Sequence, residues 1–142
     1  MAYRFDSFYI GGAWVKPSTT DVLTLENPAT RAPFATVPDA TPADAVAAIE
    51  AAASALPAWS ATPLAKRVEL MQKALEIFKT YRDEIIRLEA LELGAPVSYS
   101  ANAHCDYQFT RIESYIRESQ KVVLEEQFEQ STVVREPVGV IA

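Results

Sequence analysis

Glycine, cysteine and histidine are all scarce in this chain of 142 residues. Four glycines are present, Gly11, Gly12, Gly94 and Gly139, and their spacing forms neither a dinucleotide-binding fingerprint nor a phosphate-binding loop. Cys105 and His104 are the only residues of their types, whereas zinc needs three or four convergent ligands. A lone cysteine cannot form an internal disulfide, which fits the reducing cytoplasm. The composition therefore argues against a phosphate loop, a zinc site and a disulfide scaffold.

The sequence also lacks an excess of positive charge and a long hydrophobic run. Its formal net charge is −6, so nucleic acids and anionic membranes would repel it. No window reaches the roughly 18 apolar residues that a membrane-spanning helix requires. Asp6, Gly11 and Gly12 interrupt the start of the chain where a secretion signal would need an apolar stretch. We therefore expect no nucleic-acid partner, no membrane partner and a cytoplasmic location.

The first of three stretches, residues 7–38, has the pattern of short strands. Gly11 and Gly12 separate two β-prone runs and can adopt the positive φ angles of a tight hairpin turn. Asn27 and Pro28 predict a second turn, and Pro38 predicts the end of a further strand because proline has no amide proton to donate. The hydrophobic content of 49% is enough for the core of one domain.

The second stretch, residues 41–119, predicts helices. Thr41 is a helix cap followed by Pro42, and Pro57 is expected to end this first helix. Thr62 and Pro63 repeat the same start signal for a second helix. Its apolar face is expected to contain Leu64, Val68, Met71, Leu75 and Phe78.

Two more helices follow in the same stretch. Asp83 is expected to cap the third, and Gly94 to end it in the left-handed conformation. The fourth helix is expected to bury one side, formed by Val97, Ala101, Cys105, Phe109, Ile112 and Ile116.

The third stretch, from about residue 121, returns to β character. The segment "STVVRE" alternates moderately in polarity and predicts a strand. After Pro137, the segment "VGVIA" has no polar face, which is typical of a strand buried on both sides in a parallel sheet.

No group of residues in the sequence forms a catalytic set. His104 and Cys105 are sequence neighbours on a helix, so their side chains point about 100° apart, and we interpret Cys105 as a small buried hydrophobic residue. Glu89, Glu92 and Glu113 fit solvated faces or ion pairs on helices. From the residues alone we therefore assign no catalytic and no cofactor-binding residue to this chain.

Five pieces of the sequence, in order, resemble the amino-terminal segment of the NAD(P)-dependent aldehyde dehydrogenase family. They are "FYIGGAWV", "ENPAT", "DAVAAIEAAASALPAWSATPLAKRVELMQKA", "LEALELGAPVSYS" and "VVREPVGVIA". The resemblance implies an α/β protein that is α+β in this segment, with residues 1–142 forming a partial amino-terminal region. Its parts would be the hairpin and strands of 7–38, the helices of 41–119, an oligomerisation-type strand in 121–136, and at 137–142 the first strand of a Rossmann-like parallel sheet in the cofactor domain.

The resemblance also implies a function for an intact, longer enzyme. That enzyme would oxidise an aldehyde to a carboxylic acid with NAD or NADP, as a homodimer or homotetramer. The nucleophile, the general base and the cofactor contacts would lie farther along the chain, so the segment alone, partnered by the remainder of its own chain, would be inactive. Leu93 and Ala95 replace residues often seen as Thr and Lys in the family, which leaves the substrate undetermined.

One minor site of the family is carried over by position. Some members bind a monovalent cation through two backbone carbonyls before the Asn-Pro turn and an aspartate early in the fourth helix. In this sequence those residues would be Leu25, Glu26 and Asp106, and such oxygen ligands suit a hard cation.

A second function fits the same residues. The chain could be a stand-alone, non-catalytic module that binds or regulates other subunits through its hydrophobic strand. Coding sequence beyond Ala142 would distinguish the partial enzyme from this alternative.

Overall fold

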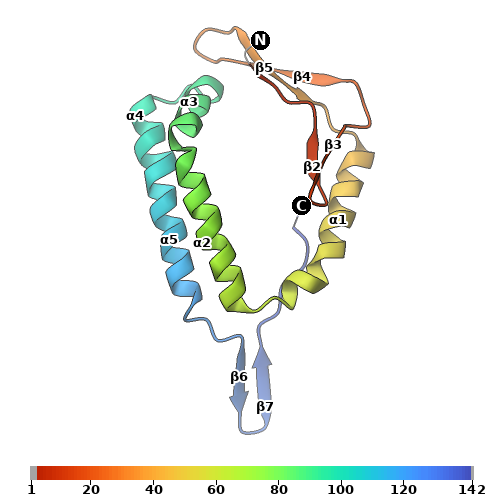
Figure 1. Ribbon diagram of the computed structural model, residues 1–142, viewed down its shortest axis with the longest axis vertical. Coiled ribbons are helices and arrows are strands. Elements are labelled where there is room, and N and C mark those ends of the chain that lie inside the picture. The colour runs from red at the N-terminus through yellow and green to blue at the C-terminus, as the bar shows by residue number, and fades with distance from the viewer. Residues whose placement is uncertain (1–2, 142) are drawn as a thin grey trace.

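The computed structural model describes residues 3–141, and Figure 1 shows the helix of residues 42–60 standing apart from a second helical arm of residues 64–119, to which a short loop joins it. The β-strands are β1 (Tyr3–Arg4), β2 (Phe8–Ile10), β3 (Ala13–Val15), β4 (Val22–Glu26), β5 (Pro33–Pro38), β6 (Glu125–Phe128) and β7 (Ser131–Val134). The helices are α1 (Pro42–Ser60), α2 (Leu64–Thr80), α3 (Arg82–Glu92), α4 (Val97–Tyr99), the π-helical segment η1 (Ser100–Asp106) and α5 (Tyr107–Ser119).

The amino-terminal strands form a hairpin and a small sheet. β2 and β3 pair antiparallel around Gly11 and Gly12, whose φ angles of 61° and 83° confirm the predicted turn. β5 lies between β4, which is antiparallel to it, and β1, which is parallel to it and was not predicted. The Asn27 side-chain oxygen accepts hydrogen bonds from two backbone amides within the next three residues, which confirms the turn between β4 and β5.

The start of α1 is as predicted, but its end is not. Thr41 and Asp44 form a reciprocal capping box, with Thr41 Oγ1 accepting from the Asp44 amide and the Asp44 carboxylate accepting from the Thr41 amide. The prediction that Pro57 ends this helix is wrong, because α1 continues to Ser60. Proline removes only its own amide donor, and its carbonyl still accepts from the Ala61 amide at 3.1 Å.

The predicted caps of the next two helices are also wrong. Thr62 makes no cap for α2, since its hydroxyl donates backward to the Ala58 carbonyl at 2.9 Å. Asp83 lies inside the first turn of α3, which begins at Arg82. By contrast, Gly94 has a φ of 72° just past α3 and confirms the predicted stop signal.

The buried core lies between α2, α3 and the continuous helical stretch of α4, η1 and α5. Phe78 and Phe109 contact edge to face with ring centroids 5.3 Å apart. Val97 departs from the prediction and is exposed, because α4 is a single short turn. Met71 and Phe78 were also predicted to lie on an apolar face, but they are 48% and 42% exposed. The buried core residues are Val68, Leu75, Ile86, Cys105, Phe109 and Ile116, of which all but Ile86 were predicted.

The carboxyl-terminal stretch forms a hairpin and then an irregular tail. The predicted strand at "STVVRE" is present as β7, and it pairs antiparallel with β6, a partner that was not predicted. Residues 135–141 form no strand, and Val138 and Ile141 are almost fully exposed, while Ala142 lies outside the described residues. A strand needs a hydrogen-bonding neighbour, and among residues 3–141 no strand pairs with this tail. Membership of residues 137–142 in a parallel sheet therefore stays a prediction for a longer chain.

The chain exposes much more surface than a compact protein of its size. Its solvent-accessible area is 10469 Å², whereas a folded monomer of 15.6 kDa is expected to expose about 7200 Å². Many of the exposed side chains are large and apolar, including Trp14 at 74% and Ile77 at 60%. The helix α1 has no buried residue at all, and its Val46 and Ile49 are 52% and 46% exposed.

Candidate functional site

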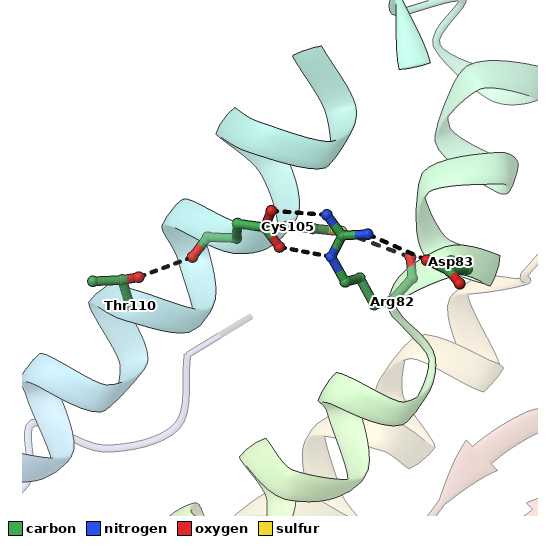
Figure 2. Close-up of polar contacts among 5 residues, drawn as sticks. Arg82, Asp83, Cys105 and Thr110 are labelled. Atoms are coloured by element: carbon green, nitrogen blue, oxygen red, sulfur yellow. Dashed lines mark hydrogen bonds and ion pairs between the residues drawn. The ribbon is translucent and has the colours of Figure 1, made fainter. Parts of the chain in front are cut away.

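A polar network joins the start of α3 to the end of η1 (Figure 2). Arg82 is the first residue of α3, and Asp106 is the last residue of η1. Arg82 Nε donates to Asp106 Oδ1 at 2.7 Å, and Arg82 Nη2 donates to Asp106 Oδ2 at 2.8 Å. A third guanidinium nitrogen, Nη1, donates to Asp83 Oδ1 at 3.2 Å. This bidentate geometry matches the planar fork of arginine to a carboxylate and fixes the direction of both side chains.

The pair shifts the protonation of both partners toward the charged forms. Hydrogen bonding by Arg82 lowers the pKa of the Asp106 carboxyl below its ordinary value of 3.8. The same hydrogen bond to Asp106 raises the pKa of the Arg82 guanidinium. Both side chains stay partly exposed, so water screens their attraction. The pair therefore orients two segments against each other more than it stabilises the fold.

Two further contacts of the same network involve backbone carbonyls. The Asp106 carbonyl accepts from Thr110 Oγ1 at 3.0 Å, and the Arg82 carbonyl accepts a weak hydrogen bond from Cys105 Sγ at 4.0 Å. Cys105 is 1% exposed. Burial, with a smaller contribution from the negative charge of Glu89, raises the pKa of the Cys105 thiol. A buried thiol that stays protonated is a poor nucleophile and packs as a hydrophobic residue, as interpreted from the sequence.

His104 has a different partner from Cys105. Its Nδ1 lies 2.7 Å from Glu89 Oε1, which joins η1 to α3 a second time. The Tyr99 ring meets the His104 ring edge to face at a centroid distance of 4.9 Å. His104 and Cys105 thus point to separate partners on α3, so the geometry supplies no nucleophile and base pair here.

The residues considered for a monovalent cation are held by other contacts. Leu25 and Glu26 end β4, where they lie opposite Ala35 and Pro33 of β5. Asp106 uses both carboxylate oxygens for Arg82. The sequence pattern could not reveal this pair, because Arg82 and Asp106 are separated by 24 residues and neither belongs to a motif.

Residues 3–141 offer neither a metal-binding cluster nor a phosphate cradle. In this described part of the chain, no group of three or more His, Cys, Asp and Glu residues is placed to hold a metal ion. Within the same residues, no helix is both long and apolar enough to cross a membrane. Gly11 and Gly12 lie in a hairpin turn, Gly94 follows a helix and Gly139 lies in the irregular tail, so these glycines do not fit a phosphate cradle between a strand and a helix.

An open, apolar groove lies on α2 and α5. It has a volume of about 500 Å³ and is lined by Met71, Ala74, Ile77, Phe78, Tyr81 and Ile112. The groove contains almost no polar atoms that could orient a small ligand. Its composition is that of a surface that another protein segment covers.

The described residues form a mixed set of strands and helices with a small core and a wide apolar surface. The model of the aldehyde dehydrogenase family matches residues 14–142. The chain belongs to the aldehyde dehydrogenase family, as its sequence predicted.

Individual relatives support this family over nearly the full chain. The glutarate-semialdehyde dehydrogenase of Pseudomonas putida is 30% identical over 139 residues, which cover 94% of this chain and 29% of that protein. The NADP(+) succinate-semialdehyde dehydrogenase of Escherichia coli is 27% identical and is covered over 28% of its length. The chain thus spans less than a third of the length of these relatives.

A solved structure gives the same result in three dimensions. The crystal structure of a Mycobacterium tuberculosis aldehyde dehydrogenase complexed with NAD+ superimposes with a TM-score of 0.89 at 32% identity. The match covers 97% of this chain and 30% of that one. The predicted α/β class is confirmed by this likeness.

Proposed function

We propose that this chain forms the amino-terminal part of an NAD(P)-dependent aldehyde dehydrogenase that oxidises an aldehyde to a carboxylic acid. The observation that carries the proposal is the superposition of 97% of the chain on part of an aldehyde dehydrogenase complexed with NAD+. The relatives named above act, by their names, on semialdehydes. An aldehyde is accordingly the class of substrate to test first.

In the intact enzyme this segment would serve as scaffold. A cysteine thiolate elsewhere in the enzyme would attack the aldehyde, amide donors would stabilise the oxyanion, and a glutamate would activate water against the thioester. NAD or NADP would supply the hydride acceptor for that reaction. The described residues fit neither the nucleophile nor the cofactor site, since the thiol of Cys105 is buried and protonated and the glycines build no phosphate cradle. The segment itself is therefore proposed to be inactive and to bind no cofactor.

The surplus of exposed apolar surface supports this role. The groove on α2 and α5 and the uncovered face of α1 would pack against the remainder of the enzyme. The hairpin of β6 and β7 has two open edges with exposed Phe128, Val133 and Val134, as expected for a strand that pairs within a homodimer or homotetramer. A cytoplasmic location goes with this proposal.

The same surface also fits the alternative of a stand-alone module that binds other subunits. Intact mass of the native polypeptide separates the two, because a partial enzyme requires a product several times longer than 142 residues. NAD(P)-linked oxidation of a panel of aldehydes should be measured for both the native protein and the 142-residue chain. We expect turnover for the native protein and none for the chain; a native mass of 15.6 kDa without turnover would support the module instead.

A further inference from the structure

Each of the three oxygen atoms of Asp106 accepts a side-chain hydrogen bond. Arg82 donates to both carboxylate oxygens at 2.7 and 2.8 Å, and Thr110 Oγ1 donates to the backbone carbonyl at 3.0 Å. Figure 2 shows the guanidinium between Asp83 on one side and the helix of Thr110 on the other. A cation at this aspartate would have to displace the guanidinium or lie next to it.

Both outcomes are unfavourable for a monovalent ion. Displacement would exchange two charge-assisted hydrogen bonds of fixed geometry for contacts to an ion that must first lose water. An ion placed beside the guanidinium would meet a like charge, and the single negative charge of Asp106 is already neutralised. The fit of a sodium or potassium ion to Leu25, Glu26 and Asp106 is therefore poor in this chain.

The pair also joins two segments of the helical arm. It connects the first residue of α3 to the last residue of η1 across 24 positions of sequence. The Cys105 thiol adds a contact from η1 to the Arg82 carbonyl, so the backbone and the side chain of Arg82 are both held against η1.

We propose that the Arg82 guanidinium is the permanent counter-ion of Asp106 and takes the place of a monovalent cation at this junction. The protein should therefore have no requirement for sodium or potassium here, and loss of the guanidinium should create one. This inference concerns the junction alone and does not depend on the proposed enzymatic activity.

The test compares salts at equal ionic strength on the complete protein. Thermal unfolding is measured by circular dichroism in NaCl, in KCl and in the chloride of N-methyl-D-glucamine, a cation too bulky for an aspartate site. For the natural protein we expect midpoints that agree within about 1 °C, because no ion binds the native state preferentially. For Arg82→Gln we expect the midpoint to rise by about 3 °C or more when sodium or potassium replaces the bulky cation.

Two controls separate charge from geometry. Arg82→Lys keeps the positive charge and should stay insensitive to the salt. Arg87→Gln removes from the same helix a positive charge that pairs with Glu84, and it should also stay insensitive. If Arg82→Gln folds but shows no preference among the three salts, the guanidinium does not replace a cation and the proposal is wrong.

A second measurement covers the case in which Arg82→Gln fails to fold. Sodium-23 line widths of the natural protein are compared with those of Asp106→Asn, which loses the carboxylate. Equal line widths support the proposal. Line broadening in the natural protein, or a sodium-specific rise in its unfolding midpoint, would overturn the proposal if Asp106→Asn abolishes it, because an ion would then be bound at Asp106.

Discussion

Gly94 lies against the ring of Pro28, so that a Cβ atom at position 94 would stand 2.7 Å from Pro28 Cγ. Gly94 ends α3 and Pro28 lies in the turn between β4 and β5, so this contact brings the helical arm against the amino-terminal sheet. Because the Pro28 ring is rigid, a side chain at position 94 has little room.

Gly94→Ala should destabilise the protein through both strain and overlap. Its φ of 72° costs an alanine about 1–2 kcal/mol, and the contact with Pro28 should raise the total to about 2–4 kcal/mol. The matched control is Gly12→Ala, where φ is 83° but nothing lies within 4 Å of the added atom. Urea unfolding of both variants measures the difference, and equal losses would show that Pro28 yields at no cost.

Thr41→Ala should cost about 1 kcal/mol, because it removes the acceptor for an amide at the start of α1. Thr62→Ala is the control, since Thr62 also comes directly before a proline at the start of a helix but does not cap that helix. We expect its loss of unfolding free energy to be smaller than that of Thr41→Ala. The reverse order would mean that the capping box contributes nothing.

Leu75→Ala should reduce the unfolding free energy by about 2–5 kcal/mol, because Leu75 is 5% exposed in the core between α2 and α5. Ile77→Ala changes a residue two positions along the same helix that is 60% exposed. In the 142-residue chain its effect should stay within about 0.5 kcal/mol. In the longer enzyme that we propose, Ile77→Ala should cost more, since the groove would be covered there.

The free energy of unfolding should fall in acid, partly because Glu69 becomes protonated. Hydrogen bonds from Lys66 and Lys73 lower the pKa of Glu69 from 4.5 to about 2. The unfolded chain therefore takes up this proton more readily than the folded chain, so the stabilisation is complete above about pH 4.5 and disappears as the pH falls to about 2.

Unfolding measured between pH 2 and pH 6 checks this behaviour. The difference between the natural protein and Glu69→Gln should be constant at the upper end and vanish toward pH 2, and added salt should reduce it because the group is exposed. Glu50→Gln, on the exposed surface of α1, serves as the control. A difference that does not change with pH would contradict the low pKa of Glu69.

Local signals in the sequence predicted those features that depend on neighbouring residues. The turn at Gly11 and Gly12, the helix cap at Thr41 and the stop at Gly94 each need only a few residues, and the structure confirms all three. The errors arose where one signal has two outcomes. Pro57 can end a helix or lie within it, and a threonine before proline can cap forward, as Thr41 does, or bond backward, as Thr62 does.

The polar junction could not be predicted because it depends on how helices pack. Arg82 and Asp106 meet only after α3 folds back beside η1, and Glu89 meets His104 for the same reason. No local pattern marked η1 as a π-helical segment either. The resemblance to a family predicted the class of the intact enzyme, but it predicted none of these contacts.

The π-helical turn lies where the last long helical stretch changes its neighbour. Upstream, α4 and η1 contact α3, whereas downstream α5 contacts α2. The wider spacing of hydrogen bonds in a π-turn accommodates one additional residue and so alters the helical phase between these two halves. If the same residues formed an ordinary α-helix, the part that precedes the turn, with the buried Ser100, would be rotated about the helix axis by roughly one residue step, about 100°, relative to α5. The π-helical turn thus sets the rotational alignment of two helix pairs.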